Sequence, residues 1–218
     1  MKKVIKKNCP LCQSSNSFLY ASGEARTYIH CRCCDLVYVP MKYFISKEAE
    51  KEKYDNHQNS PQNQGYIDFL NKLLIPLRKN LLPNAIGLDF GSGPGPTLSV
   101  IMQELGYEMK IYDYFYHDDK KVFEKSYDFI TITEVIEHLH NPIGEIKKLW
   151  NCLNPGGSLG IMTAFRPDLE IFKSWYYKRD LTHVRFFTKE TFQWLSNELN
   201  AELFIPQSGV VILKKEKI

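Results

Sequence analysis

The stretch that decides the fold is Ile86-Gly-Leu-Asp-Phe-Gly-Ser-Gly-Pro-Gly-Pro96, an apolar run followed by three alternating glycines. It predicts a strand over residues 86–90, a tight turn, and a helix over 96–106. Glycine allows positive φ and lets the backbone approach a ligand closely. A dinucleotide loop has the pattern G-x-G-x-x-G, but here Pro96 takes the third glycine position and Pro94 removes an N–H that a pyrophosphate could use. The loop therefore favours a ligand without phosphates over NAD.

Strands and helices are expected to alternate along the rest of the chain. Such an order predicts an α/β fold with a mostly parallel sheet and right-handed crossovers. The pieces are strands over 108–113, 127–133, 157–164, 201–205 and 208–213, helices over 142–152 and 188–199, and an ambiguous piece near 120–125. Ligands of such sheets bind outside the carboxyl ends of the strands.

Asp113 ends the second strand, about 20 residues beyond the glycine loop, at the distance typical of an acidic residue that binds ribose. An Asp at a strand end is also a common turn residue. Together with the glycine loop, Asp113 predicts a ribose-containing ligand.

The size, composition and charge of the chain indicate which classes of partner and location are expected. The chain has 218 residues, 44% of them hydrophobic, and a net charge of +3. That charge is too small to indicate a nucleic-acid partner, and no apolar run approaches the roughly 18–20 residues of a membrane span. The N-terminal Met-Lys-Lys-Val-Ile-Lys-Lys has no apolar core behind it, so we expect a cytoplasmic protein without a secretory signal. The oligomeric state stays open.

Four cysteines have the spacing C-x2-C-x18-C-x2-C, which predicts a zinc ribbon over residues 1–45. Disulfides are the alternative, but they are disfavoured in a cytosolic chain. A closed four-thiolate site has no open coordination position, so its zinc is expected to be structural. The ligands would be Cys9, Cys12, Cys31 and Cys34, with Cys33 a spare thiol and Cys152 a core residue.

Residues 46–83 are expected to form a linker and a lid helix. The polar part up to residue 64 shows little periodicity, and helical apolar spacing begins at Tyr66 and ends before Pro83. Tyr54 and His57 lie in the polar part, either in a surface loop or in a lid over the ligand.

Three segments together resemble the class I S-adenosylmethionine-dependent methyltransferases. They are Leu88-Asp-Phe-Gly-Ser-Gly-Pro-Gly95, Tyr127-Asp-Phe-Ile-Thr-Ile-Thr-Glu-Val-Ile-Glu-His-Leu139 and Leu153-Asn-Pro-Gly-Gly157. The chain is more narrowly similar to bacterial methyltransferases with an N-terminal zinc ribbon. Those have a Tyr-x-x-His-x-Asn segment, matched by Tyr54, His57 and Asn59, and a late aromatic block, matched by Trp175-Tyr-Tyr-Lys-Arg-Asp-Leu-Thr-His183.

The resemblance implies a Rossmann-like seven-stranded methyltransferase sheet in residues 84–218, with S-adenosylmethionine as cofactor. The cofactor-binding residues it implies are Asp89, Gly91, Gly93, Gly95, Asp113, Glu134, Tyr54 and His57. The sequence departs from the pattern at two places. Asp35 replaces the glycine usual after the last cysteine, and the segment between Asp113 and Tyr127 is short, so Asp118 and Asp119 are the only candidates for an acidic adenine contact.

Acid–base candidates follow the third predicted strand of the methyltransferase domain. Glu134, Glu137 and His138 have the i, i+3, i+4 spacing that would place them on one face of a helical turn. With the distant His183 they could bind a divalent ion, act directly as acid and base, or serve only the structure. Asp180, three residues before His183, could fix its tautomer. The catalytic candidates are therefore His138, His183 and Glu137.

The sequence predicts a methyltransferase acting on a small or carrier-linked molecule, with a hydroxyl preferred because imidazole bases suit it. A nucleic-acid methyltransferase is an alternative, but Arg26 and Arg32 are the only arginines of the ribbon, and nucleic acid is not the expected partner. An inactive cofactor-binding module and a nucleotide-dependent oxidoreductase are further alternatives. The glycine loop and Asp113 argue against the first, and Pro96 argues against the second.

Overall fold

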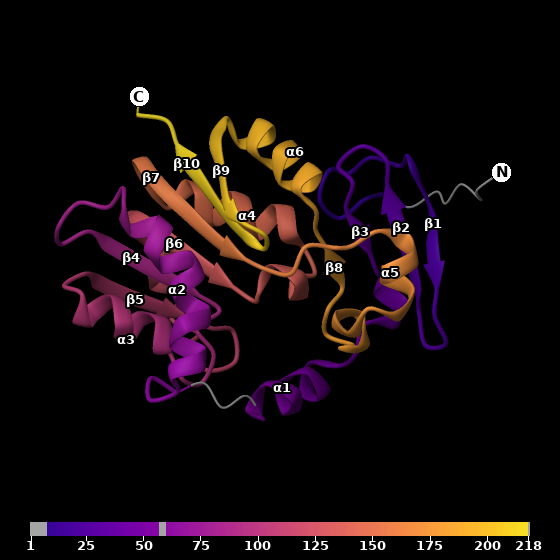
Figure 1. Ribbon diagram of the computed structural model, residues 1–218, viewed down its shortest axis with the longest axis horizontal. Helices are drawn as coiled ribbons and strands as arrows, with labels where there is room; N and C mark the ends of the chain where they lie inside the picture. Colours follow the sequence, from indigo (N-terminus) through magenta and orange to yellow (C-terminus); the bar gives the residue numbers. More distant parts are fainter. Residues whose placement is uncertain (1–7, 57–59, 218) are drawn as a thin grey trace.

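The computed structural model describes residues 8–56 and 60–217. Its central sheet has the strand order β5-β4-β6-β7-β10-β9 (Figure 1). The parallel strands are β4 (Ile86–Phe90), β5 (Glu108–Tyr112), β6 (Tyr127–Thr133) and β7 (Leu153–Met162), and the antiparallel strands are β9 (Ala201–Gln207) and β10 (Val210–Lys215). The α/β prediction is confirmed. β7 begins four residues before the predicted start, so Pro-Gly-Gly lies inside the strand rather than in a turn before it.

The described sheet has six strands, whereas the resemblance implies seven. β5 lies at one edge of the described sheet. The chain between Asp113 and Tyr127 is too short to hold both a helix and another strand. It forms a tight turn, in which Asp113 pairs with His117, and a 3₁₀ helix η2 (Lys120–Glu124) instead.

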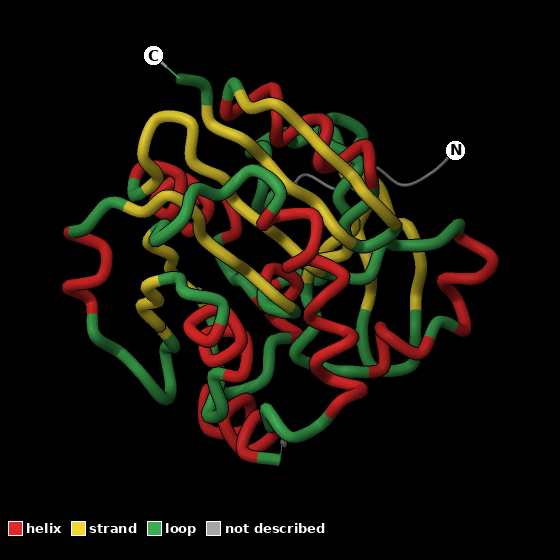
Figure 2. Tube along the Cα trace, turned by 60° about the vertical axis from the view of Figure 1, so that its left-hand side comes forward, coloured by secondary structure: helices red, strands yellow, loops and turns green. Residues whose placement is uncertain are grey.

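Helices cover both faces of the sheet, as the turned view in Figure 2 shows. On one face α2 (Gln64–Arg78) and α3 (Thr97–Glu104) share an apolar cluster with Phe129 of β6. On the other face α4 (Pro142–Asn151) and α6 (Lys189–Leu199) pack over Ile130. Phe129 and Ile130 are neighbours in the strand, so the alternation of side chains across a strand builds a separate core on each face.

A second, antiparallel sheet lies beside the first (Figure 1). Three of its strands are N-terminal, namely β1 (Ser17–Ser22), β2 (Thr27–Cys31) and β3 (Val37–Tyr38). The fourth strand, β8 (Arg185–Phe186), comes from the far end of the chain and pairs with β3. The N-terminal module predicted over residues 1–45 therefore shares a sheet with a late segment of the methyltransferase part.

Polar groups join the two sheets at Asp35, which has a φ of 60°. This left-handed conformation normally favours glycine, as the family pattern has it. Here the Asp35 carboxylate accepts hydrogen bonds from Arg166 Nη2 at 2.8 Å and from Thr188 Oγ1 at 2.7 Å. Both donors belong to the methyltransferase part of the chain. The Asp35 side chain, which replaces the glycine of the family pattern, therefore links the N-terminal module to that part.

The polar segment after the N-terminal module is helical where the sequence indicates no periodicity. It holds a 3₁₀ turn η1 (Met41–Tyr43) and helix α1 (Lys47–Asp55). Ser46 caps α1 by accepting a hydrogen bond from the Ala49 N–H at 3.3 Å, and none of its residues is buried. A helix that is polar all round has no apolar stripe to reveal it in the sequence.

Short elements complete the chain. They are η3 (Ile136–His138), α5 (Leu169–Ser174) and η4 (Tyr176–Arg179). In the described ranges no helix is both long and apolar enough to span a bilayer.

Candidate active site

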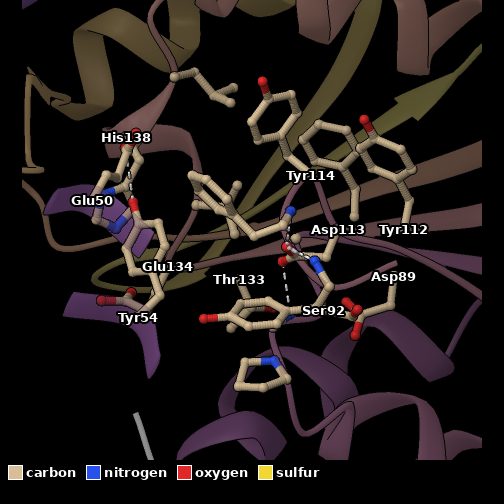
Figure 3. Close-up of a pocket in the computed structure, with 18 of the residues that line it drawn as sticks. Glu50, Tyr54, Asp89, Ser92, Tyr112, Asp113, Tyr114, Thr133, Glu134 and His138 are labelled. Atoms are coloured by element: carbon tan, nitrogen blue, oxygen red, sulfur yellow. Dashed lines mark hydrogen bonds between the residues drawn. The ribbon is translucent and has the colours of Figure 1, made fainter. Parts of the chain in front are cut away.

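A cavity of about 950 Å³ lies outside the carboxyl ends of β4, β5 and β6, with α1 over it. The glycine loop and Asp113 line one part of it, and Glu134, His138 and His183 line another. Figure 3 shows Ser92, Asp113, Glu134 and His138 among these residues. This is the position expected for the ligand of an open α/β sheet. The structure thus brings described residues of both predicted groups to one cavity, although Glu137 is buried behind it and does not line it.

The glycine loop turns sharply away from β4. Gly91 and Gly93 have φ values of 79° and 65°. The N–H groups of Gly91 and Ser92 donate to the carbonyl of Tyr112 at 2.7 and 3.2 Å, which joins the loop to β5. A Cβ at Gly91 would lie 2.3 Å from Cγ2 of Val135, so only glycine fits there.

Asp113 holds two loops with one carboxylate. One oxygen accepts from the Gly93 N–H at 2.9 Å, and the other accepts from the N–H groups of Phe115 and Tyr116 at 2.8 and 3.2 Å. These bonds fix the glycine loop relative to the end of β5. The residue also lines the cavity, which agrees with the position predicted for a ribose contact.

Buried polar groups face the same part of the cavity. Asp89 is 4% exposed and accepts from Thr131 Oγ1 at 2.8 Å, and burial raises the pKa of its carboxyl to about 7. The hydroxyls of Ser92 and Thr133 are buried with no hydrogen-bond partner within the described ranges. Because orphaned buried hydroxyls are costly, these two favour a polar ligand that satisfies them.

Glu134 and Glu137 do not share the face of a helical turn that the sequence predicts. Glu134 has a φ of 52°, and only residues 136–138 are helical. Glu137 is fully buried and accepts from the hydroxyls of Tyr177 and Thr163, the latter at 3.0 Å. Tyr177 also lies 3.4 Å from Glu134 Oε2, so its hydroxyl stands between the two carboxylates.

The two carboxyls are hard to ionise. Burial first, and then the negative charge of Glu137, raises the pKa of Glu134 to about 8. Burial also raises the pKa of Glu137 to about 7, against the opposing effect of its hydrogen bonds. At neutral pH the pair therefore holds a proton that two separate exposed carboxylates would have lost.

His138 and His183 form an imidazole pair, with ring centroids 4.7 Å apart. His183 Nδ1 lies 2.7 Å from the carbonyl oxygen of Tyr177. A carbonyl can only accept, so Nδ1 carries the proton and Nε2 keeps its lone pair. Burial lowers the pKa of His183, which favours the neutral ring.

Asp180 does not orient His183 as expected. Its Oδ1 accepts from the N–H and hydroxyl of Thr182, at 2.9 and 2.7 Å, and pairs with Lys53 of α1 at 2.7 Å. The Tyr177 carbonyl takes the orienting role instead, because the turn after η4 brings the His183 ring back to this backbone group.

The sequence leaves open a divalent ion held by Glu134, Glu137, His138 and His183. Glu137, His138 and His183 each have one ligand atom within 4.8 Å of the others, and Glu134 is not part of this group. Both oxygens of Glu137, however, already accept hydrogen bonds from Tyr177 and Thr163. The arrangement therefore favours Glu137 as a hydrogen-bonded carboxyl behind the two imidazoles and not as a metal ligand.

α1 supplies residues that the sequence interpretation missed. Glu50 lines the cavity and accepts from the Tyr54 hydroxyl at 3.1 Å. Tyr54 contacts the rings of Phe115 and His138 (Figure 3). Of the two alternatives for Tyr54, the surface loop does not hold, because the residue lies on helix α1 and lines the cavity. His57 and Asn59 lie outside the described residues.

Aromatic side chains form much of the remaining wall. Tyr114 and Tyr116, directly after Asp113, were not predicted, although their dense aromatic run was a usable signal. Of the late aromatic block, Tyr176 and Tyr177 line the cavity. Trp175, Phe186 and Phe187 pack in apolar clusters instead.

The four N-terminal cysteines meet at one point. Cys9 and Cys34 have their sulfurs 3.6 Å apart, and Cys12 and Cys31 have theirs 3.4 Å apart. All four sulfurs lie within 4.8 Å of one another. Zinc–sulfur bonds of about 2.3 Å give a tetrahedron with edges of about 3.8 Å, so the set fits a zinc ion, and the separations are far longer than the roughly 2.05 Å of a disulfide. Cys33 is exposed and Cys152 is buried, as expected.

Comparison with known proteins agrees with this geometry. The family model described as "Methyltransferase domain" matches residues 56–204. None of the curated proteins matches the sequence. The fold is similar to that of the 1,6-didemethyltoxoflavin-N1-methyltransferase of Burkholderia thailandensis, solved with 1,6-didemethyltoxoflavin and S-adenosylhomocysteine, at a TM-score of 0.53 and 15% identity over 86% of this chain and 98% of that one.

An O-methyltransferase family protein from the same organism is similar at a TM-score of 0.50 and 10% identity, over 77% of this chain and 63% of that one. Both likenesses concern the fold, whereas the family model covers most of the sequence. The chain therefore belongs to the class I S-adenosylmethionine-dependent methyltransferases.

Proposed function

We propose that the protein methylates a hydroxyl group of a small or carrier-linked molecule, with His183 as the general base. The observation that carries this proposal is the hydrogen bond from His183 Nδ1 to the Tyr177 carbonyl, which leaves the lone pair on Nε2 of a ring that lines the cavity. A hydroxyl nucleophile benefits from such a base, because its proton must leave as the new bond forms.

The glycine-loop end of the cavity suits S-adenosylmethionine. Gly91 and Gly93 bring the backbone to the cavity wall, Asp113 lies where ribose hydroxyls would bind, and Ser92 and Thr133 offer unsatisfied hydroxyls. Gly95, Asp89, Glu134 and Tyr54 complete the proposed set. When bound, this cofactor supplies a methyl group already activated on a sulfonium, so the protein mainly aligns the acceptor and excludes water.

The acceptor end is formed by imidazole, aromatic and acidic side chains. His183 would take the hydroxyl proton at Nε2, and His138 beside it would hold the acceptor oxygen. Glu50 and Asp180 line the same space, which disfavours strongly anionic acceptors. Tyr176 and Tyr177 offer ring faces for an apolar or sugar-like body.

A small-molecule acceptor also agrees with the position of Arg26. This arginine is 3% exposed and bonded within the protein, so only Arg32 of the two N-terminal arginines is available at the surface. A nucleic-acid-binding ribbon would present basic residues together on one face. Salt-dependent retention of single-stranded RNA or DNA on filters would contradict the small-molecule proposal.

Replacing His183 with alanine is expected to lower methyl transfer by about 100-fold or more, the usual contribution of a general base. The assay is transfer of tritiated methyl from S-adenosylmethionine to a panel of phenols, polyols and hydroxyacyl thioesters. His117→Gln is the matched control, since His117 does not line the cavity. Full activity of His183→Ala would remove His183 from the mechanism.

Preference for S-adenosylmethionine over S-adenosylhomocysteine is expected to increase about fivefold between pH 6 and pH 9. The two ligands share their amino and carboxyl groups and differ in the positive charge on sulfur. A Glu134 carboxyl with a pKa near 8 is neutral at the lower pH and charged at the higher one, so the charged ligand gains attraction as pH rises. Calorimetric titration of both ligands at each pH measures the ratio. A pH-dependent ratio that persists unchanged in Glu134→Gln would refute this assignment.

We further propose that the four-cysteine cluster holds a structural zinc ion. Its sulfurs are nearly all buried, and a set of four thiolates leaves no position for a reactant. The ion would stabilise a module too small to form much of a core of its own.

A further inference from the structure

Arg26, between β1 and β2, reaches out of the N-terminal module into the methyltransferase part. Its Nη1 donates to the carbonyl of Leu181 at 2.9 Å, and its Nη2 donates to the carbonyls of Lys178 and Asp180 at 2.7 and 2.6 Å. Its Nε donates to the Tyr28 hydroxyl at 3.1 Å, which fixes the plane of the guanidinium. One side chain thus bonds three backbone carbonyls of residues 178–181.

The charge of Arg26 is held without a counter-ion. The side chain is 3% exposed, and among the described residues no carboxylate lies within ion-pair distance of it. A buried guanidinium is costly unless its donors are satisfied. Carbonyls at the end of a helical turn carry the negative end of its dipole, and η4 ends at Arg179, between the bonded carbonyls. The three carbonyl bonds therefore depend on the conformation of residues 178–181.

The clamped segment leads directly to His183. The His183 N–H donates to the Asp180 carbonyl at 3.3 Å, and the ring Nδ1 bonds the Tyr177 carbonyl. The segment that Arg26 holds, residues 178–181, thus connects Tyr177, whose carbonyl accepts the hydrogen bond from Nδ1, to His183, which carries the ring. Asp180, within the same segment, also bonds Lys53 of α1 through its side chain.

From this geometry we infer that Arg26 is a positioning residue for His183, and that the N-terminal module acts in catalysis by holding the base in place. The effect of Arg26 on catalysis rests on the proposed function, in which His183 is the base. The effect of Arg26 on the orientation of His183 exists in the free protein, without any substrate. The module then serves the acceptor side of the cavity, because the hydrogen bonds of Arg26 among the described residues go to Tyr28 and to residues 178–181 and not to the glycine loop or Asp113.

The test uses the full-length protein and follows the imidazoles by long-range proton–nitrogen NMR, with His183→Asn to assign the signals. The wild type is expected to show His183 protonated on Nδ1. In Arg26→Met, loosening of the bond from Nδ1 to the Tyr177 carbonyl is expected to mix the two tautomers. Because this bond raises the pKa of His183 more than the charge of Arg26 lowers it, the pKa is expected to fall by about half a unit. Arg26→Lys is expected to restore part of both effects, since an ammonium still donates to carbonyls.

Arg32→Met is the matched control, because Arg32 belongs to the same module but is exposed. It is expected to leave His183 unchanged. Zinc content and affinity for S-adenosylhomocysteine should stay at wild-type values in every variant. If Arg26→Met fails to fold, Tyr28→Phe replaces it, since it removes only the hydroxyl that orients the guanidinium.

A wild-type His183 spectrum and titration in Arg26→Met, or in Tyr28→Phe where that variant is needed, would overturn the inference. So would identical behaviour of the Met and Lys variants, which would mean that Arg26 merely fills space. The readout needs no acceptor. If His183 proves dispensable for methyl transfer while Arg26→Met still shifts its tautomer, the proposed function fails and the positioning stands.

Discussion

Gly91→Ala is expected to weaken binding of S-adenosylhomocysteine by about 100-fold or more, measured by calorimetry. The new methyl group would lie 2.3 Å from Cγ2 of Val135, and the φ of 79° disfavours any residue with a Cβ. The left-handed conformation costs about 1–2 kcal/mol and an overpacked contact about 1–3 kcal/mol. Relief of the clash moves either the glycine loop or Val135, which is the neighbour of Glu134, and both movements change the proposed cofactor site.

Gly106→Ala is the control for the conformational part of this effect. Gly106 has a φ of 88°, but a Cβ there meets nothing within 4 Å. The variant should lose about 1 kcal/mol of stability and keep wild-type affinity. Affinity of Gly91→Ala within threefold of the wild type would show that the loop does not form the cofactor site.

Cys34→Ser is expected to remove the zinc and to lower the melting temperature by about 10 °C or more. Cys34 is 1% exposed and packs in the same apolar cluster as Leu36 and Phe187. Loss of a structural metal costs several kcal/mol, and in a chain of this length each kcal/mol shifts the melting temperature by about 2–4 °C. Metal analysis of the purified protein and a thermal scan measure the two effects.

Cys33→Ser tests whether the effect is specific to the ligand set. Cys33 lies in the same turn, but its thiol is exposed and outside the cluster. It should retain the zinc and the wild-type melting temperature. A Cys34→Ser protein that still contains one zinc ion per chain would exclude the four-thiolate assignment.

The features predicted correctly from the sequence are those with a strong local pattern. The apolar run before Gly91, the helical spacing of α2 and the cysteine spacing each depend on neighbours in the chain. They were sufficient for the α/β fold, the family and the place of the cavity. Element ends shifted by a few residues, as with β7, because hydrogen bonding to neighbouring strands decides where a strand begins.

The features that the sequence did not predict depend on distant partners. The left-handed Asp35 is explained by Arg166 and Thr188, which lie far away in the chain. The orientation of His183 by the Tyr177 carbonyl depends on a turn after η4. Likewise, α1 lacks a buried residue, so contacts with distant partners such as Tyr114, Tyr116 and Asp180 place it at the cavity. Such arrangements follow from tertiary packing rather than from local propensity.

The pairing of β3 with β8 also has a consequence for how the protein is made. Val37 pairs with Phe186, so the N-terminal sheet lacks its last strand until the segment around Phe186 has also left the ribosome. Domains commonly fold in order during synthesis, starting from the N-terminus. Here the N-terminal segment must wait for a strand that lies far downstream in the chain, with its cysteines accessible in the meantime. Newly made chains therefore depend on zinc supply and on protection from oxidation until that strand has been synthesised.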